Sequence, residues 1–180
     1  IILMHMMSKI RPDFKIMGNF LLQKIKPLDP MIIPVNPFET RKDAYSSIGG
    51  MRDALKLLRD AGCLGIFPAG EVSYRDDEGK ITDRQWQESA MKLIKKSKVP
   101  VVPMFFRAKN SNVFYRIAKM HPDFQTAMLP SEMVRKRTRP IQIRIGKPIL
   151  QKQQDEHVTI ADFTDFLRKK TYMLSSYYNK

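Results

Sequence analysis

The sequence is poor in the residues that build covalent and metal-bound frameworks: it has one cysteine, Cys63, and three histidines. A single cysteine excludes a disulfide framework and indicates a reducing compartment. Cys63 follows Gly62 at an expected helix end, and no histidine is placed to activate it, so we interpret it as a packing residue. The scattered histidines give no metal-ligand spacing, so neither a metal nor a bound cofactor is predicted.

Long apolar runs are also missing, because no stretch of 18 consecutive apolar residues occurs. A membrane-spanning helix needs about 20 such residues. Any contact with a membrane is therefore expected to be peripheral. The sequence starts at Ile1 without the basic leader of a signal peptide, and its apolar helical spacing over residues 2–10 is typical of the interior of a longer helix.

Acidic residues are scarce, since 32 Lys and Arg stand against 18 Asp and Glu, for a formal net charge of +14. Such a surface attracts nucleic acid, an anionic membrane surface or an acidic carrier protein. A basic nucleic-acid-binding module is the alternative that the cluster at residues 135–139 favours. However, basic residues are spread along the whole chain, and no zinc-ligand spacing, RNA-recognition motif or aromatic interleaving accompanies the cluster. We therefore expect no nucleic-acid partner.

Apolar patterns alternate between strand and helix along the chain. Strands are predicted at residues 14–17, 31–35, 64–67, 99–106 and 141–145, the last half-exposed at a sheet edge. Helices are predicted at residues 2–10, 19–25, 40–62, 82–98, 112–120, 131–136 and 158–178, with capping patterns at Thr40 and Thr82. This alternation predicts an α/β sandwich with a mostly parallel central sheet flanked by helices. The length and the 43% apolar content predict one domain, residues 1–180.

The segment at residues 66–73 is the most informative in the chain. Ile66 and Phe67 are interpreted as the last residues of a covered strand. Pro68 then removes a ladder donor, and Gly70 permits a sharp backbone path. Glu71 and Ser73 are thus expected just beyond the carboxyl end of the strand, where ligands bind in open α/β sheets.

Residues 67–73 and 99–103 resemble the third and fourth sequence blocks of the glycerolipid acyltransferase superfamily, Phe-Pro-x-Gly-x-x-Ser and Val-Pro-aliphatic-aliphatic-Pro. Residues 85–90 and 110–115 resemble one branch of it, which includes ornithine- and glycine-lipid acyltransferases and proteins labelled haemolysins. Four motifs occur in the expected order, and the similarity runs from about the first residue to Ile149.

The resemblance implies transfer of a fatty acyl group from a thioester of acyl carrier protein or coenzyme A to a lyso-lipid or amino-acid-lipid acceptor, in membrane lipid synthesis. It also implies peripheral attachment to the anionic inner face of the cytoplasmic membrane. Acyl transfer needs a base for the acceptor and donors for the oxyanion. The superfamily supplies the base in a His-x4-Asp motif before the Phe38 region, but His5 is followed five positions on by Ile10, and His121 by Thr126.

The dyad is therefore expected upstream of Ile1, so that this chain holds the substrate side and no catalytic residue. His157 and Asp162 do fit the spacing, but they follow every other block. Thr159 and Asp162 are better explained as a capping box that opens the last helix. The alternatives are that His157 is the base, or that the chain is a catalytically dead remnant that only binds lipid.

Phe38 and Arg41 resemble the end of the second block, Gly-x-x-Phe-x-x-Arg, with Val35 where the glycine would stand. A loop arginine can hold a phosphate or a carboxylate by paired hydrogen bonds. The alternative is a solvated charge at a helix N-terminus, which the helix dipole disfavours. Phe38 and Arg41 are predicted to bind substrate.

The third block departs from its commonest form, Phe-Pro-Glu-Gly-Thr-Arg-Ser, at Ala69, Glu71 and Val72. Losing the arginine at position 72 argues against a glycerol-phosphate acceptor, and Glu71 offers a carboxylate for an amine or hydroxyl acceptor. The alternatives are a surface salt bridge for Glu71 and a capped turn for Ser73. The predicted substrate-binding set is completed from the third and fourth blocks by Phe67, Pro68, Gly70, Glu71, Ser73 and Pro103.

Pro103 ends the fourth-block strand, where it either shapes the acyl pocket or packs in the core. Asn110 and Ser111 follow in a loop. Their side chains either line the site or hydrogen-bond their own backbone, and the sequence does not decide between the two.

Overall fold

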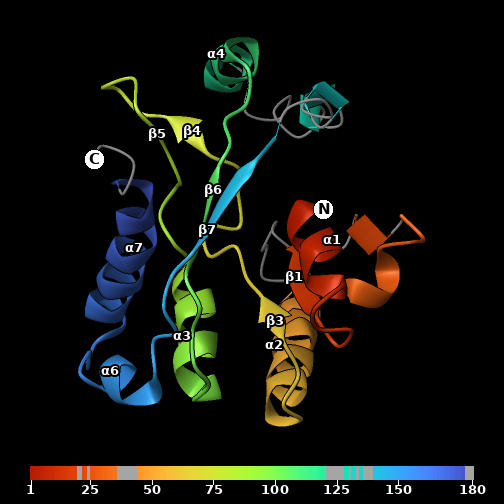
Figure 1. The fold of residues 1–180 in the computed structure, drawn as a ribbon, viewed down its shortest axis with the longest axis vertical. Coiled ribbons are helices and arrows are strands. Elements are labelled where there is room, and N and C mark those ends of the chain that lie inside the picture. Colours follow the sequence, from red (N-terminus) through yellow and green to blue (C-terminus); the bar gives the residue numbers. More distant parts are fainter. Residues whose placement is uncertain are drawn as a thin grey trace. The chain divides into compact units, whose positions relative to one another are not determined.

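The structure, a computed structural model, describes residues 1–19, 22–23, 25–35, 44–120, 128–129, 131–132, 134–135 and 140–176. Its contacts divide the chain into two compact units, and the residue colours of Figure 1 allow the segments of each to be located. Unit 1 comprises Ile1–Gly70 and Trp86–Val99, and unit 2 comprises Glu71–Gln85 and Pro100–Lys180. Among the described residues, no helix is long and apolar enough to cross a membrane.

Unit 1 contains a three-stranded parallel sheet, as the sequence predicted. Its strand order is β2-β1-β3, with bounds Ile32–Val35, Lys15–Asn19 and Leu64–Gly65. The helices of the unit are α1 (Ile2–Ser8), the 3-10 turn η2 (Asp29–Met31), α2 (Ala44–Arg59) and α3 (Glu88–Ser97). The mixed α/β architecture with a parallel sheet flanked by helices is confirmed.

The two faces of this sheet are covered by different partners. Met17 is the register partner of Ile33, and both pack with Ala54 of α2 and Leu93 of α3 in one apolar cluster. Neighbouring residues of a strand point to opposite faces, so Ile16 and Ile32 face the other way, where each is only 5% exposed. Burial on both faces is what a parallel sheet requires.

The close approach of α2 to β2 depends on Gly50. A Cβ atom at Gly50 would collide with the carbonyl oxygen of Pro34 and would lie 3.1 Å from Cγ1 of Val35. Because glycine has no side chain, the helix backbone can lie directly against the strand at this point. This contact brings Ala54, which is fully buried, onto the sheet.

Unit 2 contains two antiparallel pairs of strands and several helices, of which α7 (Ile160–Ser176) is the longest among the described residues. The hairpin pairs β4 (Tyr74–Arg75) with β5 (Ile81–Thr82), and β6 (Met104–Arg107) pairs with β7 (Gln142–Ile145). The shorter helices are α4 (Asn112–Met120) and α6 (Gln151–Asp155). Phe105 of β6 meets Tyr172 of α7 edge to face, with ring centroids 6.0 Å apart. Helix α7 therefore packs along the β6–β7 pair.

Two strand predictions were wrong in extent. The strand predicted at residues 64–67 ends at Gly65, and Phe67 is not covered but 53% exposed, because a turn begins there. The strand predicted at residues 99–106 forms only at Met104–Arg107, with an isolated bridge from Val101 to Ile149. Pro100 and Pro103 interrupt it because neither can donate to a ladder. Its partner β7 runs antiparallel, so the fourth block lies outside the parallel sheet.

Several predicted helices are present, but their observed ends differ from the predicted ones. Thr82 does not cap a helix: it ends β5, and α3 begins at Glu88 after the N-cap Gln87. Asn19, expected to open a helix, ends β1. The helix predicted at residues 158–178 is observed as Ile160–Ser176, whereas α6 was not predicted. Thr40, Arg41 and Asp43, at the expected start of α2, lie outside the described residues.

Candidate functional site

The third block begins with a tight turn in unit 1. The amide of Gly70 donates to the carbonyl of Phe67 over 2.9 Å, and Gly70 has a φ of +68°. Only glycine adopts this conformation without strain. Gln87 packs against the turn, because its backbone amide donates to the carbonyl of Pro68 at 2.9 Å. Its side chain lies so close to Gly70 that a Cβ atom there would be 2.6 Å from Nε2 of Gln87. The sharp path expected at Gly70 is confirmed.

The same turn explains the motif at residues 85–90, which the sequence identified only by resemblance. The side-chain amide of Gln87 also reaches the carbonyl of Ala69, at 3.4 Å, and its neighbour Trp86 is buried. This glutamine therefore holds three successive residues of the third block in place from 17 or more positions away. Ala69 is only 5% exposed, so a longer side chain there would meet the core.

In unit 2, Glu71 belongs to a group that we call the Arg84 cluster, which consists of Glu71, Tyr74 and Arg84. Nε of Arg84 lies 2.9 Å from Oε2 of Glu71, and the guanidinium carbon lies 4.6 Å from the centre of the Tyr74 ring. The arginine and glutamate side chains are 42% and 56% exposed. The cluster is thus an exposed ion pair whose guanidinium lies over an aromatic ring. A surface salt bridge of Glu71 was the sequence-based alternative to direct binding of the acceptor by this residue.

Helix α7 holds the backbone that carries Arg84. The hydroxyl of Tyr172 accepts a hydrogen bond from the amide of Asp83 at 2.9 Å. Nη2 of Arg168 donates to the carbonyl of Asp83 at 3.1 Å and to Oγ1 of Thr82 at 3.3 Å. Both backbone polar groups of Asp83 are therefore bound by side chains of one helix, which fixes the residue immediately before Arg84.

A second group, which we call the Tyr115 cluster, consists of Ser73, Arg75, Asn110, Asn112 and Tyr115. The hydroxyl of Tyr115 lies 3.1 Å from Oγ of Ser73 and accepts from the amide of Asn110 at 3.2 Å. Nη2 of Arg75 donates to Oδ1 of Asn112 at 2.9 Å, and its guanidinium lies 5.7 Å from the centre of the Tyr115 ring. This cluster ties the β4–β5 hairpin to the start of α4.

The start of α4 is in turn anchored by a buried carboxyl group. Oγ of Ser111 accepts from the amide of Phe114 at 3.1 Å, which is the N-cap bond of the helix. The same hydroxyl donates to Oε1 of Glu132 at 2.5 Å, and the amide of Ser111 donates to Oε2 at 2.8 Å. Glu132 is 4% exposed. Ser111 therefore serves the backbone here, which was one of its two sequence-based readings.

Of the predicted substrate-binding residues, Phe67, Pro68 and Gly70 lie in unit 1, and Glu71, Ser73 and Pro103 lie in unit 2. Phe38 and Arg41 lie outside the described residues. Glu71 and Ser73 both lie in unit 2, but one joins the Arg84 cluster and the other the Tyr115 cluster. Pro103 is buried, and its carbonyl accepts from the amide of Gly146 at 2.8 Å, so it packs where β6 meets the end of β7. The binding roles themselves stay predictions.

Sequence reasoning missed Arg84, Tyr115 and Glu132. Arg84 was read only as part of a capping pattern, and Tyr115 only as part of a resemblance. Glu132 carried no local signal, because its partner Ser111 lies 21 positions away. A buried carboxyl group can be inferred from sequence only when its partner is adjacent or periodic, and neither holds here.

His157 and Asp162 form a pair at the start of α7, with Nδ1 of His157 2.8 Å from Oδ2 of Asp162. The amide of Asp162 donates to Oγ1 of Thr159 at 3.1 Å, which confirms the predicted N-cap. The imidazole stacks on Phe166 at a centroid distance of 4.0 Å and an interplanar angle of 26°. The pair thus fastens the entry of α7, and ring stacking holds the imidazole in a fixed orientation.

Cys63 lies half-buried in unit 1, and burial raises the pKa of its thiol above the ordinary value. A raised pKa lowers the thiolate fraction, which is consistent with a packing role. Within the ranges that the structure describes, no three His, Cys, Asp or Glu side chains gather in a way that would hold a metal ion.

A family model described as acyltransferase matches residues 2–179 of the chain. A lyso-glycine lipid O-acyltransferase of Phocaeicola vulgatus is 30% identical over 167 residues, covering 87% of this chain and 56% of the relative. The protein of that name from Bacteroides thetaiotaomicron is 30% identical over 171 residues, covering 89% and 59%. The chain therefore spans little more than half the length of these relatives. No solved structure gives a significant match.

Proposed function

The chain belongs to the acyltransferase family, and from that premise we propose that it forms the acceptor side of an enzyme that acylates the hydroxyl group of a lyso-lipid with an amino-acid head group. The relatives are named for lyso-glycine lipid, which makes a glycine lipid the first acceptor to test. The acyl donor is a thioester of acyl carrier protein or coenzyme A.

One observation carries the proposal. The segment that resembles the third block forms a hydrogen-bonded turn at residues 67–70. Of the residues that come next in the sequence, Glu71 belongs to the Arg84 cluster and Ser73 to the Tyr115 cluster. An accessible carboxylate paired with an arginine whose neighbouring backbone is fixed, as Glu71 and Arg84 are within unit 2, is a local arrangement that can recognise a polar head group. The side chain of Glu71 is 56% exposed, so an acceptor can contact the third block at this residue.

The proposed reaction has three chemical steps. A base takes the proton of the acceptor hydroxyl, and the hydroxyl oxygen attacks the thioester carbonyl to form a tetrahedral oxyanion. Its collapse breaks the carbon–sulfur bond and expels the thiolate, which takes the proton from the base. We assign the base to a His-x4-Asp motif in a part of the parent protein outside residues 1–180, and the longer relatives leave room for it. The net charge of +14 supports an anionic donor carrier and attachment to the anionic cytoplasmic face of the membrane.

The test is a transfer assay with protein made from the complete coding sequence. Acyl carrier protein and coenzyme A thioesters are offered with two acceptors: an N-acyl glycine whose acyl chain carries a hydroxyl group, and lysophosphatidate. We expect the glycine lipid to be acylated faster, and a strong preference for lysophosphatidate would overturn the proposed acceptor. No acyl transfer to any lipid would overturn the enzyme itself.

A pair of histidine variants locates the base. Replacing the histidine of an upstream His-x4-Asp motif by alanine is expected to abolish transfer, because the base is lost. His157→Ala is expected to retain transfer, because His157 fastens the start of α7. The opposite result would make His157 the base, and would return the dyad to this chain.

A further inference from the structure

Arg84 presents an unused pair of donors. Its Nε edge faces Glu71, and its flat surface lies over Tyr74. Within the part of the chain that the structure describes, neither Nη1 nor Nη2 of Arg84 has a hydrogen-bond partner. The two terminal nitrogens of a guanidinium are the parallel donors that bind a carboxylate or phosphate bidentately.

The guanidinium is also fixed before any ligand arrives. The backbone of Asp83 is bound at both its amide and its carbonyl by α7, as described above. Tyr74 pairs with Thr82 in the β4–β5 ladder, and Arg84 follows Thr82 by two residues, with its guanidinium carbon 4.6 Å from the centre of the Tyr74 ring. Ring stacking and the contact with Glu71 then restrict the side chain itself. Preorganisation of this kind lowers the entropic cost of binding.

The charge beside Arg84 selects among anions. Glu71 neutralises the arginine locally, so a bound anion meets a pair with no net charge. Repulsion from Glu71 scales with the charge of the ligand, and a phosphate monoester carries close to two negative charges near neutral pH, against one for a carboxylate. Glu71 therefore lowers the affinity for a phosphate monoester more than it lowers the affinity for a carboxylate.

From these observations we propose that Arg84 binds the head-group carboxylate of the acceptor and that Glu71 discriminates against a phosphate head group. This inference rests on the proposed acyltransferase function and names the chemistry of its acceptor. A glycine joined to an acyl chain through its nitrogen keeps its carboxylate, which would face Nη1 and Nη2 of Arg84. Glu71 then acts through Arg84 rather than by binding an amine.

Binding without transfer tests the proposal on the 180-residue chain. The probes, held in neutral detergent micelles, are the hydroxylated N-acyl glycine, lysophosphatidate of equal acyl length and an uncharged monoacylglycerol. The wild-type protein is expected to bind the glycine probe more tightly than the uncharged monoacylglycerol. Arg84→Gln is expected to weaken that binding about tenfold or more, because a charge-assisted bidentate contact is lost, and Arg84→Lys should lie between the two.

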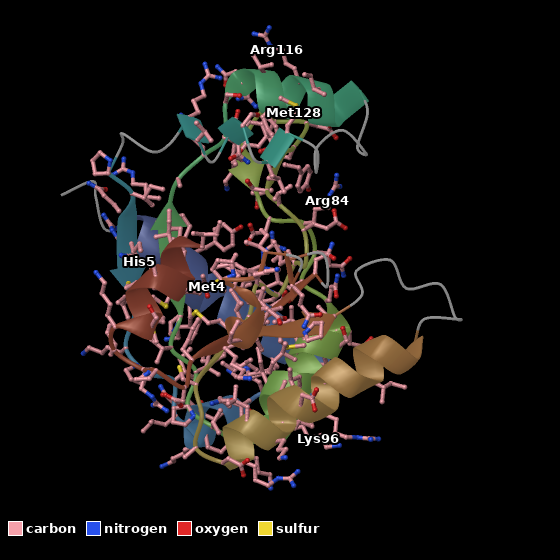
Figure 2. The ribbon with its side chains drawn as sticks, turned by 90° about the vertical axis from the view of Figure 1, so that its right-hand side faces the viewer. Met4, His5, Arg84, Lys96, Arg116 and Met128 are labelled. Carbon is pink, nitrogen blue, oxygen red and sulfur yellow. The ribbon has the colours of Figure 1, made fainter. Side chains whose placement is uncertain are left out.

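Arg116→Gln is the matched control, because it also removes one exposed arginine from unit 2. Figure 2 shows Arg84 beside the β4–β5 hairpin and Arg116 on the side of α4 that points away from it. Binding within twofold of wild type is expected for this variant. Equal losses for Arg84→Gln and Arg116→Gln would reduce the effect to general electrostatics and would overturn the proposal.

Glu71→Gln tests the discrimination. It is expected to strengthen lysophosphatidate binding several-fold more than it changes binding of the glycine probe. An unchanged ratio of the two affinities would overturn the role of Glu71. If the wild-type chain binds all three probes equally, the carboxylate site is refuted. The transfer assay would still decide the proposed function separately, because it scores acylation rather than head-group affinity.

Discussion

The β4–β5 hairpin carries two arginine–tyrosine pairs that differ in how their donors are used. Arg75 lies over Tyr115 and donates to Asn112, while the Tyr115 ring is 4% exposed and its hydroxyl is hydrogen-bonded on both sides. Arg84 lies over Tyr74 and pairs with a carboxylate that is itself exposed, and among the described residues its two terminal nitrogens make no hydrogen bond. The same two residue types thus form a fully hydrogen-bonded contact, which we call the clasp, in one place and the proposed anion site, which we call the receptor, in the other.

The difference follows from what surrounds each tyrosine. Tyr115 belongs to α4, whose first turn is fastened by Ser111 and the buried Glu132, so Arg75 meets a rigid and fully partnered surface. Tyr74 belongs to a two-residue strand, and the rigidity of the Arg84 cluster comes instead from α7 through Asp83. A cation on an aromatic ring therefore indicates binding only when its other donors are not already used.

The largest loss of unfolding free energy is expected at Glu132, which holds the first turn of α4 and thus the clasp. Glu132→Ala removes the acceptor for both the amide and the hydroxyl of Ser111. Leaving such donors unpaired in a largely buried place costs about 2–3 kcal/mol of unfolding free energy. Urea unfolding followed by far-ultraviolet circular dichroism measures this loss. Glu132→Gln keeps one acceptor and should lose less, and equal losses for the two variants would contradict the hydrogen-bond explanation.

The two tyrosines give the next largest contrast. Tyr115→Phe removes a hydroxyl with two partners and should lower the unfolding free energy by about 1–2 kcal/mol. Tyr74→Phe keeps the ring beneath Arg84 and, among the described residues, breaks no hydrogen bond, so its loss should stay below about 0.5 kcal/mol. Comparable losses in urea unfolding would mean that the two pairs do not differ in kind.

The contrast between the clusters also marks what sequence alone could predict. The parallel sheet was predictable because apolar runs such as residues 31–35 are buried on both faces and need no information about distant partners. The Thr159 cap was predictable for the same reason, since a capping motif is contained in four successive residues. Both are local patterns whose physical cause lies within a few positions.

The candidate site was less predictable because its contacts join distant positions. Strands β4 and β5 have two residues each, too few to show a period, so no apolar pattern predicted them from the sequence. Val72 was read as the loss of a cation from the third block. A guanidinium is instead supplied by Arg84, 12 positions later in the sequence, which pairs with Glu71.

Salt should distinguish the Arg84 cluster from the Tyr115 cluster by a smaller effect. A double-mutant cycle between Arg84→Gln and Glu71→Gln measures a coupling free energy that should fall toward zero at about 1 M salt, because both side chains are accessible. A cycle between Ser73→Ala and Tyr115→Phe measures a neutral hydrogen bond on a buried ring, whose coupling should change little. Equal salt dependence would remove the distinction between clasp and receptor.

The smallest effect is expected from Glu71→Gln alone at low salt. An exposed ion pair contributes about 0.2–1 kcal/mol, and because both partners are well over one-third exposed, solvent screening places this one at the lower end. A loss below about 0.5 kcal/mol in urea unfolding is therefore expected, even though the same variant should change the ratio of phosphate to carboxylate affinity. That combination matters because a residue kept for stability would show the reverse pattern. A large stability loss with an unchanged affinity ratio would make the Arg84 cluster a second clasp.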